Sequence, residues 1–221
     1  MKKKKRWKKI LIIVVLGFVL LAKPTWDYLV QQVKHPTGIV GYSLTKIWNN
    51  TFVAMTAWGL GSVPIKESDK ILDVGCGGGE TVNSLSKKLS TGKVYGIDIS
   101  DEAIKSSVER NTDEIKKGTV ELQIADVLKL PFDENMFQLV TAVQTHMYWD
   151  DVPKGFQEIF RVMSNESLLV ILTEKDKIDY HMDEYKDDES LIGLLIGIGF
   201  NDVEVSEQGN WVCYYVTKSS K

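Results

Sequence analysis

The segment ILDVGCGGGE (71–80) places four glycines within five positions, directly after an apolar run. Glycine allows positive φ and lets a ligand approach backbone N–H groups closely, which suits a turn at the amino end of a helix. Two carboxylates follow, Asp98 at the end of KVYGID (93–98) and Asp126 at the end of VELQIAD (120–126). A carboxylate about 20 residues beyond such a turn can accept both hydroxyls of an adenosine ribose. The spacing predicts a nucleoside site, with Asp126 near the adenine edge.

The residues around the turn indicate which kind of nucleoside ligand the site would bind. The dinucleotide fingerprint G-x-G-x-x-G requires glycine at position 80, where this chain has Glu80, whose carboxylate would repel a pyrophosphate. A P-loop is excluded because no Gly-Lys-Ser/Thr follows. Asp73, two residues before Gly75, suits a cationic amino group rather than phosphate. We therefore expect an adenosine that carries an amino-acid-like tail.

Seven apolar runs of strand length are expected to position these residues. They are KILDV (70–74), KVYGID (93–98), VELQIAD (120–126), FQLVTAVQT (137–145), SLLVILTE (167–174), VEVSEQ (203–208) and WVCYYVTK (211–218). Ser100 and Asp151 have the side chains and positions of helix N-caps between runs. Only Gly209 and Asn210 separate the last two runs, which predicts a hairpin. The expected fold is α/β, a doubly wound, mostly parallel sheet of seven strands whose last strand is antiparallel.

Charge is concentrated at the amino end. Seven of the 27 basic residues lie within positions 1–9, so residues 10–221 carry 20 basic and 30 acidic residues, a net charge of −10. An acidic body repels a phosphate backbone, so we expect no nucleic-acid partner. Two cysteines are too few for a disulfide framework.

An uncharged apolar segment, 10–22, follows the basic tail. Thirteen helical residues span only about 20 Å against a hydrocarbon core of roughly 30 Å. The segment would still cross a membrane if Trp7 and Trp26 lay at the two interfaces. A cleaved signal peptide and a helix lying on the membrane surface are the alternatives. We predict a basic tail and membrane-anchor helix over 1–24.

Residues 25–68 have a helical pattern, interrupted at 35–38. Apolar side chains recur at steps of three or four, at Leu44, Ile47, Trp48, Phe52, Met55 and Trp58. This stripe predicts a helical cap that packs on the main domain, and the same cap would serve as a lid over a bound ligand. The remaining residues, 69–221, form the predicted nucleoside-binding domain.

The segments LDVGCGGG, GIDIS, IADVLKLPF and EIFRVM together resemble the class I S-adenosylmethionine-dependent methyltransferases, over roughly residues 36–218. HPTGIVG and TAWGL are most similar to small bacterial enzymes akin to the quinone-biosynthesis methyltransferases. The resemblance implies S-adenosylmethionine as cofactor and methyl transfer to a small or lipophilic acceptor. The chain departs from the family at 164–167, where Ser-Asn-Glu-Ser replaces Lys-Pro-Gly-Gly. We expect altered loop geometry there, remote from the cofactor.

The resemblance also implies roles for individual residues. The methionine part would contact Asp73, Gly75, Cys76, Gly77 and Gly79. Asp98 and Ile99 would contact the ribose and adenine, Asp126 and Val127 the adenine, and Gln144 the sulfonium side.

Methyl transfer needs an in-line nucleophile, and a general base only where the acceptor is protonated. His146 is the candidate base, with a place in the pocket wall as its alternative. Tyr148 and Trp149 would contact the substrate or simply pack. Residues 175–190, with His181, lie where substrate loops insert, although their acidity also fits a solvated surface. The three histidines and two cysteines show no metal-ligand spacing, so we expect no metal.

The basic tail precedes the apolar segment, which by the positive-inside rule predicts an external catalytic domain. S-adenosylmethionine is a cytosolic compound, and on that ground we expect a cytoplasmic domain tethered to the cell membrane by a single anchor, with a membrane-associated acceptor. Two other functions are considered. One is a non-catalytic, membrane-tethered S-adenosylmethionine-binding module. The other is a nicotinamide-dependent oxidoreductase, against which Glu80 argues.

Overall fold

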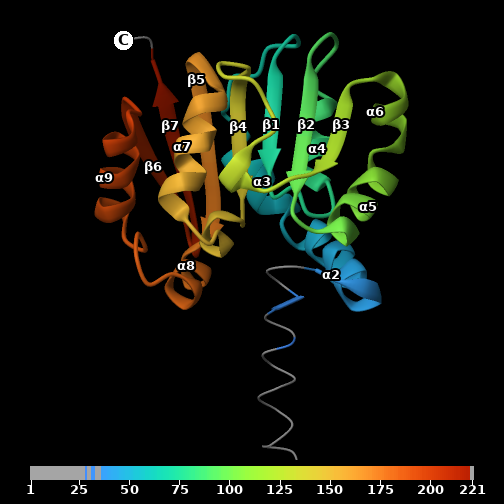
Figure 1. Cartoon of the computed structure of the whole chain (residues 1–221), viewed down its shortest axis with the longest axis horizontal. Helices are drawn as coiled ribbons and strands as arrows, with labels where there is room; N and C mark the ends of the chain where they lie inside the picture. The colour runs from blue at the N-terminus through green and yellow to red at the C-terminus, as the bar shows by residue number, and fades with distance from the viewer. Residues whose placement is uncertain (1–27, 29–30, 33–35, 220–221) are drawn as a thin grey trace, which may run out of the picture.

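The computed structural model describes residues 28, 31–32 and 36–219. Its centre is one seven-stranded sheet in the order β3-β2-β1-β4-β5-β7-β6 (Figure 1). The strands are β1 (Lys70–Val74), β2 (Lys93–Asp98), β3 (Val120–Ile124), β4 (Phe137–Val143), β5 (Met163–Glu174), β6 (Asp202–Gln208) and β7 (Trp211–Lys218). β1 to β5 are parallel to one another, and β7 pairs antiparallel with both β5 and β6. The predicted α/β sheet with a reversed last strand is confirmed.

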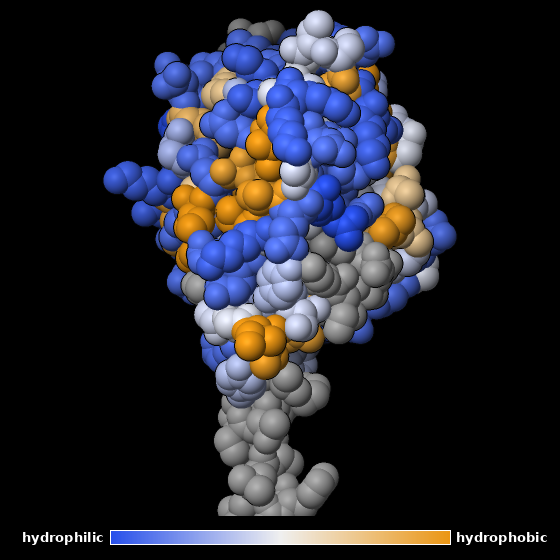
Figure 2. All heavy atoms as spheres, turned by 90° about the vertical axis from the view of Figure 1, so that its right-hand side faces the viewer, coloured by the Kyte–Doolittle hydropathy of each residue, from blue (hydrophilic) through white to orange (hydrophobic). Residues whose placement is uncertain are grey.

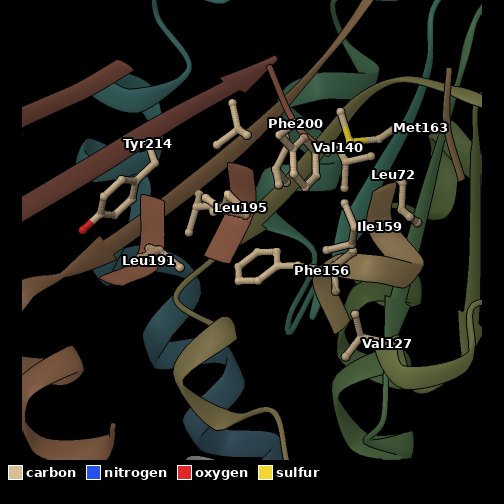
Figure 3. Close-up of a cluster of buried hydrophobic side chains, with 14 of the residues drawn as sticks. Leu72, Val127, Val140, Phe156, Ile159, Met163, Leu191, Leu195, Phe200 and Tyr214 are labelled. Carbon is tan, nitrogen blue, oxygen red and sulfur yellow. The ribbon is translucent and has the colours of Figure 1, made fainter. Parts of the chain in front are cut away.

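Helices cover both faces of the sheet, and each face has its own apolar core. They are α2 (Gly38–Thr51), α3 (Val53–Gly59), α4 (Glu80–Ser86), α5 (Asp101–Arg110), α6 (Thr112–Lys117), α7 (Val152–Val162), α8 (Lys175–His181) and α9 (Asp188–Ile198), with short 3-10 turns η1 (Val127–Lys129) and η2 (His146–Tyr148). On one face Phe156 and Ile159 of α7 and Leu195 of α9 pack on the sheet (Figure 3). On the other face the core includes Met55 of α3 and Leu85 of α4.

Both predicted N-caps are confirmed. The Ser100 hydroxyl accepts a hydrogen bond from Ala103 N at 3.2 Å, and the Asp151 carboxylate accepts one from Lys154 N at 2.9 Å. Such caps satisfy amides that a helix start leaves without partners, typically stabilising it by about 1 kcal/mol. Ser100 and Asp151 thereby fix where α5 and α7 begin relative to the strands before them.

The cap is helical as predicted, and it lies at the carboxyl ends of the strands. Three contacts connect the α2 region to α5: Ser100 Oγ donates to Pro36 O at 2.6 Å, Gly38 N donates to Glu102 at 3.0 Å, and Tyr42 donates to Glu109. Within the predicted stripe, Met55 is fully buried and Trp58 packs against Trp211. The side chains of Ile47 and Trp48 lie outside the described residues.

The residues at 164–167 form strand rather than the loop expected from the family pattern. β5 starts at Met163, directly after α7, and its register with β4 is irregular between Phe137 and Leu139. The Ser167 hydroxyl donates to Ser164 O at 2.6 Å and so bridges this irregular start. The change is at the amino end of β5, at the opposite edge from the carboxyl ends of the strands.

Within the described residues, no helix has both the length and the apolar character to cross a membrane. The predicted anchor at 10–22 lies outside those residues, as does His35.

Candidate functional site

A cavity of about 210 Å³ lies at the carboxyl ends of the parallel strands, under α2 and α3. Nine of the ten residues predicted to bind the cofactor line it: Asp73, Gly75, Cys76, Gly77, Asp98, Ile99, Asp126, Val127 and Gln144. Residues from the tips of β1, β2, β3 and β4 thus border one space. In an open α/β sheet this is the edge at which ligands bind.

The glycines of the turn have different tasks. At Gly77, with φ of +51°, a side-chain carbon added to the backbone would meet nothing within 4 Å, so the backbone faces open cavity. At Gly79, with φ of +80°, it would lie 2.3 Å from Ser107 Oγ and 2.5 Å from Asn111 Nδ2. Gly79 therefore packs the start of α4 against α5 and does not line the cavity. Gly75 also has positive φ and lies against Thr145.

Asp98 joins the turn to the end of β2. Its Oδ2 accepts a hydrogen bond from Gly77 N at 2.9 Å, and its Oδ1 accepts one from Ser100 N at 2.9 Å. The carboxylate is held in place by backbone amides while it borders the cavity.

Asp73 lies at the buried end of the cavity, with 2% of its surface exposed. Burial raises the pKa of Asp73 to about 7; a hydrogen bond from Thr141 Oγ1 at 2.6 Å opposes this rise, and the nearby Asp98 charge adds to it. A cation placed beside Asp73 would favour the ionised form. The site therefore suits a positively charged amino group, as predicted from the position of Asp73 before the turn.

An apolar slot lies between the tips of β2 and β3. Ile99 is half exposed, and it lines the cavity together with Val127 and Leu128. Asp126 begins η1, where its Oδ1 accepts a hydrogen bond from Leu128 N at 2.9 Å. A flat aromatic base would fit between these apolar side chains, with a carboxylate at its edge.

Cys76 and Glu80 complete the wall near the turn. Cys76 N donates to Ile97 O at 2.8 Å, and burial raises the pKa of its thiol, which therefore stays protonated and serves as an apolar wall. Glu80 lines the cavity and forms an ion pair with Arg110.

Gln144 directly follows β4 and lies in the left-handed region, with φ of +55°. Its amide nitrogen donates to Glu174 Oε2 at 2.9 Å, and its amide oxygen accepts from Thr173 Oγ1 at 3.2 Å. A non-glycine residue in this conformation persists only where its surroundings determine it. The end of β5 therefore holds Gln144 against the cavity.

The structure does not bring His146 to the cavity. Its side chain is fully buried, with its ring against Trp149 and Phe156. Neither ring nitrogen has a hydrogen-bond partner among the described residues, and burial lowers its pKa to about 4. A base must reach the proton that it removes. The geometry corrects the expected role, because His146 here belongs to the core behind the wall.

Tyr148 and Trp149 do line the cavity, on the side of β4. Trp149 Nε1 donates to Thr145 Oγ1 at 3.2 Å, and burial, with a smaller effect of the Glu174 charge, raises the pKa of Tyr148 to about 12. His181 stands behind Tyr148, with ring centroids 4.8 Å apart, and borders a neighbouring cavity. Within the predicted substrate-loop segment 175–190, residues 175–181 form helix α8 and α9 begins at Asp188.

Comparisons with known proteins address what this cavity binds. A family profile described as "Methyltransferase domain" matches residues 72–171, which contain the turn, both carboxylates and β4. This match supports the predicted relationship to the class I S-adenosylmethionine-dependent methyltransferases.

Individual relatives share only part of their length with this chain. It is 30% identical over 128 residues to a 2-phytyl-1,4-naphtoquinone methyltransferase of Nostoc punctiforme, covering 58% of this chain and 53% of the relative. It is 32% identical over 117 residues to a demethylmenaquinone methyltransferase of Symbiobacterium thermophilum, covering 52% and 44%. The chain therefore spans about half the length of these curated relatives.

The fold is shared with solved methyltransferases. A SAM-dependent methyltransferase from Aquifex aeolicus superposes with a TM-score of 0.65 at 24% identity, covering 79% of this chain and 97% of that one.

The cavity fits S-adenosylmethionine as the cofactor. Gly77 leaves space where any side chain would project, and the buried Asp73 carboxylate suits the amino group of the methionine part. Asp98 and the slot between Ile99 and Val127 suit the ribose and adenine. The donor set and the open cradle thus match the amino group, the ribose and the adenine of the cofactor.

Several cavity residues were not predicted from the sequence. Pro36, Thr45, Phe52 and Thr56 roof the cavity from the cap. Phe52 belongs to the predicted apolar stripe, and stripe position alone does not separate a core residue from a cavity wall. Nothing in the sequence marked Thr141 as the hydrogen-bond partner of Asp73, because threonine is common in strands.

Proposed function

We propose that the protein transfers a methyl group in line from S-adenosylmethionine to a small, lipophilic acceptor. The observation that carries the proposal is one cavity that joins the Gly77 turn, Asp98 and Asp126 to an aromatic wall at Tyr148 and Trp149. The first part suits an adenosine with an amino-acid tail, and the second suits an apolar acceptor beside it.

The bound cofactor supplies an electrophilic methyl group on a sulfonium. The chain's own residues would hold and orient the cofactor. Asp73 would bind its amino group and Asp98 its ribose hydroxyls, while Gln144 would line the cavity on the sulfonium side, next to β4. Phe52 and Thr56 of the cap roof the cavity and would exclude water from the bound cofactor. Positioning supplies a large part of the rate in such a transfer. We therefore assign no general base, and expect an acceptor that is already nucleophilic or that loses its proton to water.

The acceptor side of the cavity supports a lipophilic ring as substrate. Phe52, Val143, Tyr148 and Trp149 contribute apolar and aromatic surface there. Two relatives are named for phytyl-naphthoquinone and demethylmenaquinone substrates. We take an isoprenoid quinone precursor as the acceptor class to test first.

Residues 1–24 are proposed to attach the protein to the cell membrane, with the domain on the cytoplasmic side. Seven basic residues beside an apolar segment favour anionic lipid, each basic residue adding about 1 kcal/mol near the surface. Attachment would place the enzyme where a lipophilic acceptor is dissolved.

Methyl transfer is tested in detergent with methyl-labelled S-adenosylmethionine and a demethylated naphthoquinone that dithionite keeps reduced. The electron-rich hydroquinone ring can accept the methyl cation and release a proton, whereas the oxidised quinone cannot. We expect label in the organic extract with the parent protein, and a loss of at least 100-fold with Asp98→Ala. Asp113→Ala, at the exposed start of α6, is the control and should match the parent. Binding of S-adenosylhomocysteine without transfer to this quinone or to any fraction of a membrane extract would instead support the non-catalytic binding module.

A further inference from the structure

Exposed apolar side chains gather around the mouth of the cavity. Nine large apolar residues are well exposed in the described part of the chain, and seven of these lie on the cap or at the carboxyl edge of the sheet. Those seven are Tyr28, Ile39, Val40, Val53, Ile99, Ile124 and Tyr180. None of the nine lies in the loops at the opposite edge, where the strands begin. Single exposed apolar residues are ordinary, but their gathering at one edge is not expected from scatter.

Four of these residues are close in the chain or in space to the cavity wall. Ile99 lines the cavity itself, Val53 follows the wall residue Phe52, and Ile124 precedes the wall residue Ala125. The Tyr180 ring meets the His181 ring edge to face, and the His181 ring contacts the wall residue Tyr148.

The helix α2 carries the most exposed of them. Ile39 has 86% of its surface exposed and Val40 has 40%, whereas Gly38 and Tyr42 of the same helix bond to α5. Figure 1 shows α2 and α8 at the end of the sheet to which the strand arrows of β1 and β2 point, and Figure 2 shows apolar atoms exposed at that end. We call Ile39, Val40, Ile99, Ile124 and Tyr180 the mouth rim.

We propose that the mouth rim dips into the surface of a lipid bilayer, so that the cavity opens toward the membrane and the acceptor enters from the lipid. The choice of a bilayer as the partner comes from the chain itself. The apolar segment 10–22, with seven basic residues before it, ends sixteen residues before Gly38. That stretch reaches at most about 55 Å when fully extended, so a lipid-bound segment keeps α2 near the membrane.

If residues 1–24 attach the protein to the membrane, a weak contact between the mouth rim and the bilayer is enough to orient the domain. Once the basic and apolar segment is bound, the rim meets the bilayer as an intramolecular event at high effective concentration. The rim offers apolar side chains from α2, α8 and the ends of β2 and β3, which suits a shallow interfacial contact rather than insertion. The net charge of −10 over residues 10–221 would keep the rest of the domain away from anionic lipid. This inference rests on the proposed attachment through residues 1–24, but not on methyl transfer.

Depth-sensitive fluorescence tests the orientation in the full-length protein. Variants with one added cysteine, Ile39→Cys and Tyr180→Cys, are labelled with a polarity-sensitive dye, and Ile196→Cys on α9 and Ser68→Cys at the opposite edge are the controls. The native Cys76 and Cys213 are buried and should not react in the folded protein. The vesicles contain phosphatidylcholine and phosphatidylglycerol, with or without brominated acyl chains.

We expect blue-shifted emission and bromine quenching for the dyes at 39 and 180, with neither change at 196 and 68. Rim dyes that behave like the control dyes on vesicle-bound protein would overturn the proposal, and so would a failure of the protein to bind the vesicles.

A second pair of variants makes the same test by affinity. Ile39→Glu should weaken vesicle binding about tenfold, since it removes an apolar contact of the size of one side chain, while Ile196→Glu should not. Equal vesicle affinity of these two variants would count against the rim. Methyl transfer to a detergent-dissolved acceptor is measured separately. If a protein whose mouth rim contacts lipid transfers no methyl group, the proposed function is wrong but the membrane contact of the rim is still supported.

Discussion

Replacing Gly77 by alanine separates a ligand-binding turn from one that merely folds. Gly77 has φ of +51°, a conformation that costs a residue with a side chain about 1–2 kcal/mol. A chain of this size loses roughly 2–4 °C of melting temperature for each kcal/mol. The added methyl group meets no protein atom within 4 Å, so folding should suffer only this backbone cost.

Gly118, at the end of α6, is the matched control. It has φ of +79°, and a side-chain carbon added there would also meet nothing within 4 Å, but Gly118 does not line the cavity. Gly77→Ala and Gly118→Ala should therefore melt a few degrees below the parent and close to each other. Only Gly77→Ala places a methyl group where the methionine part of the cofactor would lie, at a cost of about 1–3 kcal/mol for overpacking, or roughly 5- to 150-fold in affinity.

The assay is calorimetric titration with S-adenosylhomocysteine, together with thermal unfolding of both variants. If Gly77→Ala binds as tightly as Gly118→Ala, the glycine-rich turn does not face the cofactor.

Three further results are expected. Burial raises the pKa of Asp73 to about 7, and a bound ammonium group would lower that pKa, so binding of S-adenosylhomocysteine should release up to one proton at pH 6 and almost none at pH 8. Calorimetry in buffers of different ionisation enthalpy measures the number of protons released, and Asp73→Asn should abolish the release. Thr141→Val removes the hydroxyl that holds the Asp73 carboxylate and should weaken cofactor binding by about 1.5–3 kcal/mol, roughly tenfold or more; unchanged affinity would mean that the bond has no part in binding. His146→Phe should keep kcat within about twofold and reduce the loss of stability between pH 6.5 and 4, because the buried imidazole must gain a proton on unfolding in that range; a loss of activity of 100-fold in a folded variant would restore the histidine as base.

The sheet was predictable because its signals are local and repeated. Each strand is a short apolar run, and the caps at Ser100 and Asp151 mark helix starts by residue type alone. The reversal of β7 followed from the two-residue link at Gly209. The start of β5 was not predictable, because it depends on a hydrogen bond between Ser167 and Ser164 that no periodicity reveals.

The cofactor side of the site was predictable for a topological reason. Residues at the carboxyl ends of neighbouring parallel strands must meet, so Asp98 and Asp126 could be assigned to one cavity from chain position. Gly79 and His146 show the limit of this argument. Both belong to segments that border the cavity, but their orientation depends on tertiary packing, against Ser107 for Gly79 and against Phe156 for His146.

The tips of β1, β2 and β3 are expected to bind one adenosine. The affinity of Asp98→Ala for S-adenosylhomocysteine tests this binding most directly. The change removes a carboxylate that accepts two backbone amides and would accept the ribose hydroxyls. Charged hydrogen bonds contribute about 1.5–3 kcal/mol each, which predicts a loss of affinity of roughly 100-fold or more. Asp101→Ala, three residues later and outside the cavity, should bind as the parent does. Equal affinity of folded Asp98→Ala and the parent would contradict the account.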